Sequence, residues 1–224
     1  MIKKIAVLLL CLVVSLPLLA EDKLAKRISD STAVLQTILS KQELPKNVLN
    51  KADCVIVFPS VKKVGIGLGV SYGRGVMTCR SGSNMTGPWS APAMYSLDTG
   101  SLGAQLGGTA TDFVLLVMNP QAAGKALMGK LKLGADASAT AGPSSASAGT
   151  YDEKADILTY SQAKGLFAGA SLGTASMTAD DSANKDLYGK DLTAAQIVRD
   201  GAVQTTHAGK PLVDLLTQYS PKHM

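Results

Sequence analysis

Aromatic residues are scarce in this chain: they make up 4% of its 224 residues, and only one of them is Trp. Aromatic side chains usually supply much of the buried volume of a core. Their scarcity excludes a core built around large rings, so aliphatic side chains and close contacts between backbones must form it. The 22 Gly residues fit that requirement and favour β-structure packed through small residues.

Histidine and cysteine are also rare. The chain has two His residues, His207 and His223, and three Cys residues. No grouping of Cys and His has the spacing of a zinc site. We therefore expect neither a metal nor a cofactor.

The G-x-S-x-G pattern of serine hydrolases occurs twice, around Ser71 and around Ser171. Two matches in a chain rich in Gly and Ser show how easily this pattern arises from composition. Neither serine lies at a predicted turn from strand to helix, where the chemistry requires it, and only His207 and His223 offer an imidazole base. We expect no enzymatic activity and keep a hydrolase as the lesser alternative.

The first residues have the layout of a secretory signal peptide. Lys3 and Lys4 precede an apolar run over residues 5–19, and Ala20 is followed by Glu21. The run is short for a membrane span. We expect residues 1–20 to be a signal peptide and residues 21–224 a single domain in the periplasm, associated with the membrane; a retained anchor is the alternative.

Without this leader the chain is only mildly basic. Its formal net charge falls from +5 to +3, because Lys3 and Lys4 are removed and no acid is. That excess is too small to indicate nucleic acid, although a local cluster of cations suits an anionic lipid surface.

Two cysteines remain after the leader, Cys54 and Cys79. An even count in an exported protein indicates one disulfide. The alternative is a pair of separate buried thiols.

Glycine falls on alternate residues of one stretch, at Gly65, Gly67 and Gly69 and again at Gly73 and Gly75. Since side chains alternate across a strand, one face is bare and the other, from Val64 to Val76, is mostly apolar. Glycine weakens a strand unless something packs closely against it, so close packing is the first interpretation. We expect a turn near residues 71–73. A similar spacing of Gly and Ser over residues 165–173 predicts a second, related hairpin.

The remaining pattern predicts an α+β fold, with a Gly-rich, mainly antiparallel β core flanked by N-terminal and C-terminal helices. Residues 22–41 form an amphipathic helix whose apolar stripe includes Leu24, Ile28 and Leu35. A strand over residues 54–58 is expected to end at Pro59. Residues 179–189 are expected to be a polar loop, Thr193 to cap a helix, and Pro211 to open the last helix.

Basic residues gather around the helix and the glycine stretch. They suggest an anionic headgroup site beside a helix that lies on a membrane. The alternatives are a helix that covers the sheet and a scattered set of surface charges. The candidate lipid-binding residues are Lys23, Lys26, Arg27, Lys62, Lys63, Arg74, Lys130 and Lys132.

Several blocks of sequence, in order, resemble the SYLF domain family. They include residues 44–50, 55–59, 63–77, 89–93, 132–138, 160–169 and 187–189. The resemblance covers nearly the whole chain after the leader and implies a lipid-binding domain. Eukaryotic relatives bind phosphoinositides through a basic amphipathic N-terminal helix, and some bind and bundle actin. This chain has no SH3 or FYVE module and resembles an exported bacterial protein, so only the lipid-binding property is carried over.

The leading hypothesis is therefore non-enzymatic binding of anionic phospholipid at the bacterial envelope, through the N-terminal helix and nearby basic residues. The alternative is a structural or assembly factor of the envelope that pairs with a protein partner through its Gly-edged strands.

Overall fold

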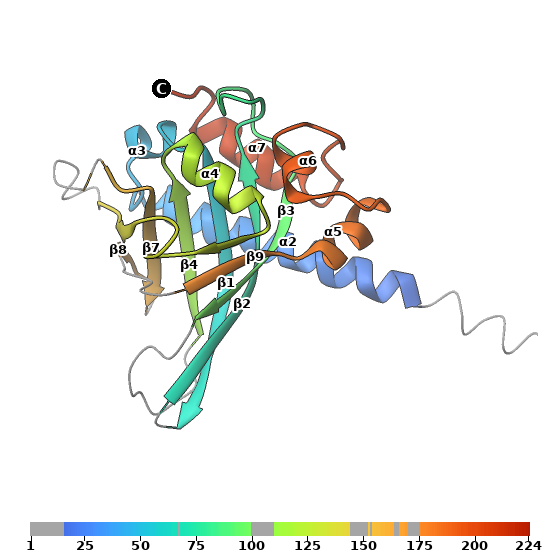
Figure 1. Ribbon diagram of the computed structural model, residues 1–224, viewed down its shortest axis with the longest axis horizontal. Coiled ribbons are helices and arrows are strands. Elements are labelled where there is room, and N and C mark those ends of the chain that lie inside the picture. Colours follow the sequence, from blue (N-terminus) through green and yellow to red (C-terminus); the bar gives the residue numbers. More distant parts are fainter. Residues whose placement is uncertain are drawn as a thin grey trace, which may run out of the picture.

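A computed structural model describes residues 16–66, 68–99, 110–143, 152, 154–163, 166–169 and 175–224. These residues form one curled sheet with helices on both of its faces (Figure 1). The strands are β1 (Cys54–Ile66), β2 (Leu68–Cys79), β3 (Ala93–Thr99), β4 (Ala110–Val117), β5 (Lys130–Lys132), β6 (Ala139–Ala141), β7 (Ile157–Ala163), β8 (Leu166–Gly169) and β9 (Ala175–Ala179).

The strand order is β5-β9-β3-β2-β1-β4-β7-β6, and β8 pairs with β7. Every pairing between these strands is antiparallel except that of β6 with β7. The predicted α+β fold with a mainly antiparallel core is confirmed.

Two hydrophobic clusters lie on opposite faces of the sheet, because successive residues of a strand point to opposite sides. Ile56 and Phe58 of β1 belong to one cluster, and Val55 and Val57 belong to the other. Helices α4 and α6 cover the first face, whereas α2 and α7 cover the second. The helices are α2 (Leu16–Ser40), α3 (Lys46–Asn50), α4 (Pro120–Leu127), α5 (Asp181–Tyr188), α6 (Ala194–Val198) and α7 (Lys210–Tyr219).

The apolar stripe of α2 is packed against the sheet. Leu24, Ile28 and Leu35 are at most 6% exposed and belong to the same cluster as Val55 and Val57. Of the two interpretations of this segment, a helix that lies on a membrane and a helix that covers the sheet, the structure shows the second. The stripe is not available to a bilayer, because it already shields apolar strand residues from water.

Pro59 does not end the first strand, contrary to expectation. β1 continues to Ile66 through a bulge at which its registers with β2 and β4 both shift. Ser60 has φ of 50° at this bulge, and its backbone N–H donates to Asp112 Oδ1 over 2.7 Å. Proline is tolerated at a bulge because the ladder hydrogen bonds are already interrupted there.

The turn predicted near residues 71–73 is also misplaced. Ile66 pairs with Leu68, so the chain reverses between them, and residues 71–73 lie inside β2. The long extended segment is thus two strands of one hairpin, which Figure 1 shows extending below the rest of the sheet.

Close packing explains two glycines of the row. A Cβ at Gly73 would lie 2.6 Å from Val61 Cγ2, and one at Gly75 would lie 1.9 Å from the carbonyl oxygen of Val57. Both contacts involve β1 on either side of its bulge. The interpretation of the row as a close-packing device is confirmed at these positions.

The second Gly and Ser stretch is only partly described. β7 and β8 form an antiparallel hairpin, whereas β9 pairs with β3 and β5. Gly165, Ser171 and Gly173 lie outside the described residues. The relation between the two hairpins stays a prediction.

Residues 179–189 were expected to be a loop, but most of them form α5. Asp180 caps this helix by accepting from the N–H of Ala183. Asn184 is fully buried, and its Oδ1 accepts from the N–H of Met94 over 2.7 Å. The polar side chains that resembled a loop are used for capping and for a buried contact with β3, which local composition does not reveal.

The C-terminal helices follow the sequence signals. Thr193 forms a capping box with Gln196 at the start of α6, and Pro211 stands in the first turn of α7. Among the described residues, no helix is long and apolar enough to cross a membrane.

Candidate basic groove

A surface cavity of about 340 Å³ lies between α2, the bulge of β1 and the middle of β2. We call it the basic groove, because five cationic side chains and one carboxylate line it. Its lining residues are Lys23, Lys26, Arg27, Asp30, Pro59, Ser60, Lys62, Tyr72, Gly73 and Arg74.

Two periodicities bring these cations together. Lys23, Lys26 and Arg27 are spaced three and four residues apart, so they share one side of α2 while the apolar stripe faces the sheet. Lys62 pairs with Tyr72 across the hairpin, and Arg74 lies two residues farther along β2 on the same face. The structure thus unites five of the eight candidate lipid-binding residues.

Arg27 is held by an acid from a distant part of the chain. Its Nη1 lies 2.9 Å from Asp180 Oδ2, and the two side chains are 9% and 17% exposed. Asp180 also caps α5. This pair fixes α2 to the start of α5, so Arg27 has a structural partner as well as a place in the groove.

Lys26 and Arg74 have local partners. Lys26 Nζ lies 2.7 Å from Asp30 Oδ2, and both side chains are well exposed. Arg74 Nε donates to the Tyr72 hydroxyl, and the guanidinium lies 5.6 Å from the centre of the Tyr72 ring. The hydrogen bond to Tyr72 raises the pKa of Arg74.

The side chains of Lys23 and Lys62 are exposed, and neither side chain forms a hydrogen bond or an ion pair with another described residue. Asp30 and Asp180 compensate at most two of the five cations around the groove. The groove therefore carries an excess of positive charge, which favours an anion.

The other candidates lie elsewhere. Lys130 and Lys132 are exposed on either side of buried Leu131 in β5, but β9 and β3 separate this strand from β2. Lys63 pairs with Ser71 through the backbone, and its side chain lies outside the described part of the structure.

Cys54 and Cys79 form the predicted disulfide. They are direct partners in the pairing of β1 with β2, with sulfur atoms 2.12 Å apart, and both are fully buried. The disulfide ties the base of the hairpin that carries Lys62, Tyr72 and Arg74.

Ser71 has no environment for nucleophilic catalysis. It lies within β2, between partners Lys63 and Thr99, and is 9% exposed. A nucleophile elbow requires a sharp turn from strand to helix. Ser171 lies outside the described residues, and within the described ones no three Cys, His, Asp or Glu residues are grouped to hold a metal.

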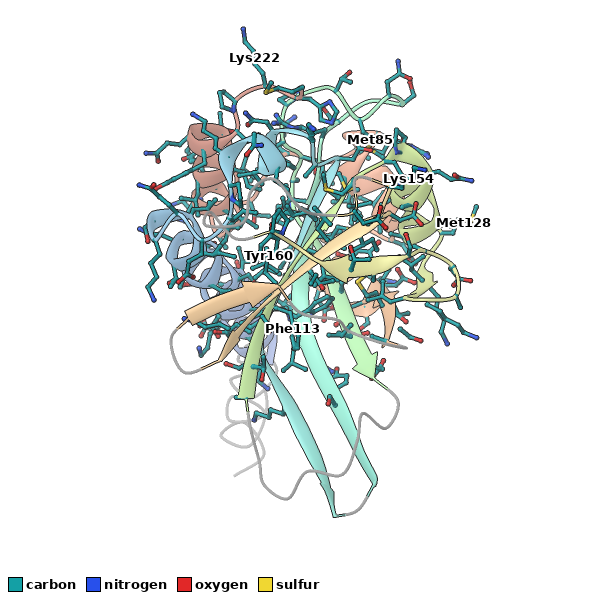
Figure 2. All side chains as sticks on the ribbon, turned by 90° about the vertical axis from the view of Figure 1, so that its left-hand side faces the viewer. Met85, Phe113, Met128, Lys154, Tyr160 and Lys222 are labelled. Atoms are coloured by element: carbon teal, nitrogen blue, oxygen red, sulfur yellow. A yellow bond between two sulfur atoms is a disulfide. The ribbon has the colours of Figure 1, made fainter. Side chains whose placement is uncertain are left out.

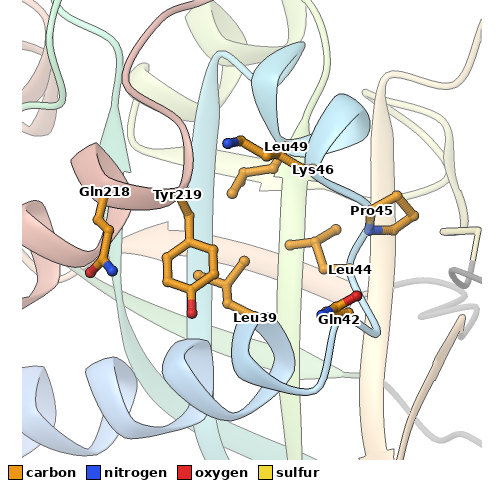
Figure 3. Close-up of a pocket in the computed structure, with 8 residues that line it drawn as sticks. All are labelled: Leu39, Gln42, Leu44, Pro45, Lys46, Leu49, Gln218 and Tyr219. Carbon is orange, nitrogen blue, oxygen red and sulfur yellow. The ribbon is translucent and has the colours of Figure 1, made fainter.

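A second cavity, of about 470 Å³, lies at the other end of α2 (Figure 3). Its walls come from the end of α2, from α3 and from the end of α7, and Lys46 is its single charged residue. Leu39, Leu44 and Leu49 line it but are themselves at most 3% exposed. This cavity therefore lacks the cluster of cations that lines the basic groove.

The C-terminus is clamped by a buried arginine that sequence patterns did not reveal. Arg80 is 1% exposed, and its Nη2 donates to both the carbonyl oxygen and the hydroxyl of Ser220, each over 2.7 Å. Its guanidinium lies 4.1 Å from the Trp89 ring centre, and Trp89 Nε1 donates to the same carbonyl over 2.9 Å. Arg80 is therefore a packing residue and is not available to a ligand.

Tyr72 is the aromatic residue of the groove, and sequence reasoning missed it. It was assigned to the apolar face of the glycine row, but the structure places it 44% exposed between Lys62 and Arg74. The sequence indicates that Lys62, Tyr72 and Arg74 share one face only when the position of the turn is known. The turn decides which residues of the two strands pair with one another.

Comparison with known proteins identifies a family. Residues 98–219 match the family described as "Ysc84: Las17-binding protein actin regulator". This segment runs from the last two residues of β3 to the end of α7, so it includes β4, which flanks the hairpin on one side.

The chain is also similar to several eukaryotic proteins. It is 34% identical over 188 residues to SH3 domain-containing protein PJ696.02 of Schizosaccharomyces pombe, covering 81% of this chain and 42% of that protein. It is 31% identical over 204 residues to LAS seventeen-binding protein 3 of Saccharomyces cerevisiae, covering 87% of this chain and 42% of that protein. SH3 domain-containing YSC84-like protein 1 of Xenopus laevis is 26% identical over 206 residues, which are 90% of this chain and 60% of the relative.

The chain thus spans less than two thirds of the length of each of these relatives. The family match covers more than half of its residues, and the identity to the S. pombe protein extends over four fifths of it. This chain belongs to the Ysc84 family, the SYLF-domain family of actin-regulating and lipid-binding proteins.

Proposed function

We propose that this protein binds anionic phospholipid at the bacterial envelope, without enzymatic activity, and that the basic groove holds the headgroup. The observation that carries the proposal is the convergence of five cations on one cavity from three separate segments. Lys23 and Lys62 are free to contact a phosphate, and Arg74 can offer its remaining N–H groups.

The proposal changes how α2 meets a membrane. Its apolar stripe is buried, so insertion of the stripe would require α2 to leave the sheet. Contact through the polar side, where Lys23 and Lys26 are exposed, needs no rearrangement and is electrostatic. Binding should therefore weaken as salt screens these charges.

Lys130 and Lys132 are proposed as a secondary contact, outside the groove. They are exposed on an edge strand, where lysine also discourages unwanted strand pairing. Protection of the edge strand is sufficient to explain why lysines occupy these two positions. Variants of Lys130 and Lys132 therefore serve as the control for variants of the groove residues. The same proposal places the chain in the periplasm after removal of residues 1–20.

Flotation with vesicles tests the proposal. The protein should float with vesicles of phosphatidylglycerol and phosphatidylcholine, much less with phosphatidylcholine alone, and less at high salt. The double variant Lys62→Glu/Arg74→Glu should reduce flotation by about tenfold or more, because each reversal replaces an attraction of about 1 kcal/mol with repulsion. Equal recovery with both vesicle types at every salt concentration would exclude the electrostatic mechanism.

The matched control is Lys130→Glu/Lys132→Glu, which changes the net charge by the same amount on the edge strand β5, which β9 and β3 separate from β2. We expect it to reduce flotation less than the groove variant does. An equal reduction would mean that net charge, and not the groove, determines binding.

A second candidate is an assembly factor that pairs with a protein through the hairpin. It is favoured by one observation: among the described residues, no other strand pairs with β1 beyond Lys62 or with β2 before Ser71. Open strand edges accept another strand. Isolation of a stoichiometric protein partner, with no lipid retained in a native mass measurement, would favour this candidate over lipid binding. The actin-related names belong to longer relatives, and we do not propose that function for a chain that we place in the periplasm.

A further inference from the structure

We propose that Asp112 is a positioning residue of the basic groove, and that its carboxylate holds the bulge of β1 in the conformation that turns Lys62 toward an anionic headgroup. This inference rests on the proposed function and concerns the same site. Asp112 is not among the residues that line the groove, so it acts through the backbone of β1 and does not touch the ligand.

The bulge of β1 contains one extra residue. The pairings with β4 on its two sides are Phe58–Phe113 and Val61–Thr111. Two residues of β1 lie between these pairs, whereas β4 has only Asp112 there. Figure 2 labels Phe113 beside this place and shows it above the lower part of the hairpin. Asp112 is therefore the single residue of β4 that stands opposite the bulge.

The extra residue reverses the faces that the following side chains occupy. Before the bulge, Val57 belongs to the cluster that α2 covers, and Phe58 belongs to the cluster on the opposite face. Unbroken alternation would direct Val61 toward α2 and Lys62 toward the opposite face. The structure has the reverse, because Val61 lies in the same cluster as Phe58, and Lys62 lines the groove beside α2. The bulge is therefore the reason that Lys62 belongs to the groove.

The bulge includes an unfavourable backbone conformation at Ser60. Its φ of 50° lies in the left-handed region, which residues with a Cβ seldom adopt. Contacts made in the folded chain must hold a residue there. The bond of 2.7 Å from the Ser60 N–H to Asp112 Oδ1 is such a contact, and a carboxylate acceptor makes it stronger than a neutral one would. Loss of this bond should therefore release the segment that places Lys62.

Charge and position predict opposite effects for the removal of Asp112. Asp112 is an acid bonded to Ser60, which lines a groove with an excess of positive charge. Charge alone therefore predicts tighter binding of an anion when Asp112 is removed. A positioning role predicts weaker binding, because Lys62 would no longer be held toward the anion. The direction of the change distinguishes the two.

The test uses the full chain, expressed with its own leader and purified from the envelope, and vesicles of phosphatidylglycerol and phosphatidylcholine at low salt. Asp112→Ala should bind about fivefold more weakly than the unchanged protein, which is the effect of losing one lysine near an anionic surface. Asp112→Asn removes the same charge but keeps an oxygen that accepts the Ser60 N–H, so it should bind at least as tightly as the unchanged protein. Thermal unfolding shows whether each variant is folded at the temperature of the assay.

Asp98→Ala is the matched control for charge. Asp98 pairs with Tyr72, and its exposed side chain forms no hydrogen bond with another described residue. Directly paired residues of neighbouring strands face the same side, so Asp98 lies on the face of the groove. This variant removes one acid without changing the bulge. It should bind as tightly as the unchanged protein or more tightly.

A double-mutant cycle tests whether the effect passes through Lys62. In a Lys62→Gln background, Asp112→Ala should weaken binding no further, since the side chain that it positions is already uncharged. In a Lys23→Gln background, Asp112→Ala should still weaken binding about fivefold, because Lys23 belongs to α2 and does not depend on the bulge.

Ser60→Gly provides a rescue. Glycine adopts a positive φ without the cost of a Cβ, so the bulge should persist in this background without its bond to Asp112. Asp112→Ala should then weaken binding by less than about twofold. If Asp112→Ala alone does not fold, the double variant Ser60→Gly/Asp112→Ala should fold and bind, and its failure to do so would show that Asp112 does not act through the bulge.

The outcomes separate this inference from the proposed function. If the unchanged protein fails to bind anionic vesicles at low salt, both fail. If it binds but Asp112→Ala binds as tightly as Asp98→Ala does, the groove attracts lipid through charge and the positioning role of Asp112 is refuted. Equal weakening by Asp112→Asn and Asp112→Ala, or weakening that persists in the Lys62→Gln background, would refute it as well.

Discussion

Gly75 lies so close to Val57 that a Cβ on Gly75 would be 1.9 Å from the carbonyl oxygen of Val57. The phenyl ring of Phe58 is the next obstacle, at 2.7 Å. Both atoms belong to β1 just before its bulge, and the backbone oxygen cannot move away without disturbing the ladder between β1 and β2. Glycine at position 75 is therefore required by the packing of one strand on its neighbour.

Gly75→Ala should destabilise the protein by about 2–4 kcal/mol, since an added methyl group in a filled site displaces backbone. Urea unfolding measures this change. Gly124→Ala is the control, because a Cβ at Gly124 in α4 meets nothing within 4 Å. Alanine is the better helix former, so this control should be neutral or stabilising by up to about 1 kcal/mol. Similar losses in both variants would contradict the packing argument.

Arg27→Ala should cost more stability than Lys26→Ala. The pair of Arg27 with Asp180 is mostly buried and joins α2 to α5, whereas Lys26 and Asp30 form an exposed pair within one helix. We expect losses of about 1–3 kcal/mol for Arg27→Ala and of less than about 0.5 kcal/mol for Lys26→Ala. Thermal or urea unfolding of the two variants distinguishes them, and equal losses would show that the long-range pair does not hold α2 in place.

Arg80→Ala should release the C-terminal segment. The Ser220 carbonyl would retain Trp89 as a donor but lose Arg80, and the stacking on Trp89 would disappear. We expect a loss of about 2–4 kcal/mol and, because Trp89 is the single Trp, a change in its fluorescence before unfolding. Arg199→Ala, which removes an exposed arginine paired with its neighbour Asp200, should leave both stability and fluorescence nearly unchanged.

Asp53 and Asp156 should give the stability opposite dependences on pH. Burial raises the pKa of Asp53, despite the His223 imidazole 3.0 Å away. The folded state then binds its proton more tightly than the unfolded state, so Asp53 lowers stability as pH rises from its unfolded pKa, about 4, through its folded pKa. Burial opposes ionisation of Asp156, but hydrogen bonds from Asn119 and Ser138 outweigh it and lower the pKa. Its contribution is present above the unfolded pKa and is lost as pH falls through the folded value.

Urea unfolding over a series of pH values tests both signs. Relative to the unchanged protein, Asp53→Asn should gain stability as pH rises above about 4. Asp156→Asn should be less stable than the unchanged protein above about pH 4, and this difference in stability should shrink as pH falls below about 4. Slopes of the same sign for the two variants would contradict this assignment of the two carboxyl groups.

Local periodicity was sufficient for most of the elements that surround the site. The 3.6-residue stripe of Leu24, Ile28 and Leu35 predicted α2, and the capping signal at Thr193 predicted α6, because these signals act over a few residues. The polar stretch of α5 was misread, since the role of Asn184 depends on its contact with Met94, 90 positions away in the chain. The position of the hairpin turn was also missed, because alternation continues unchanged on both sides of Gly67.

By itself, the sequence determined the class of fold, the family, the pair of cysteines and the basic character of the residues on α2 and the hairpin. These properties depend on composition, spacing and short-range periodicity, which are the same however the chain folds. Only the tertiary structure decided that the apolar stripe of α2 faces the sheet and that Lys23, Lys62 and Arg74 share one groove while Lys130 and Lys132 do not. The physical reason is that register and helix placement are chosen by burial across the whole sheet, where a shift of one residue reverses the face of every side chain.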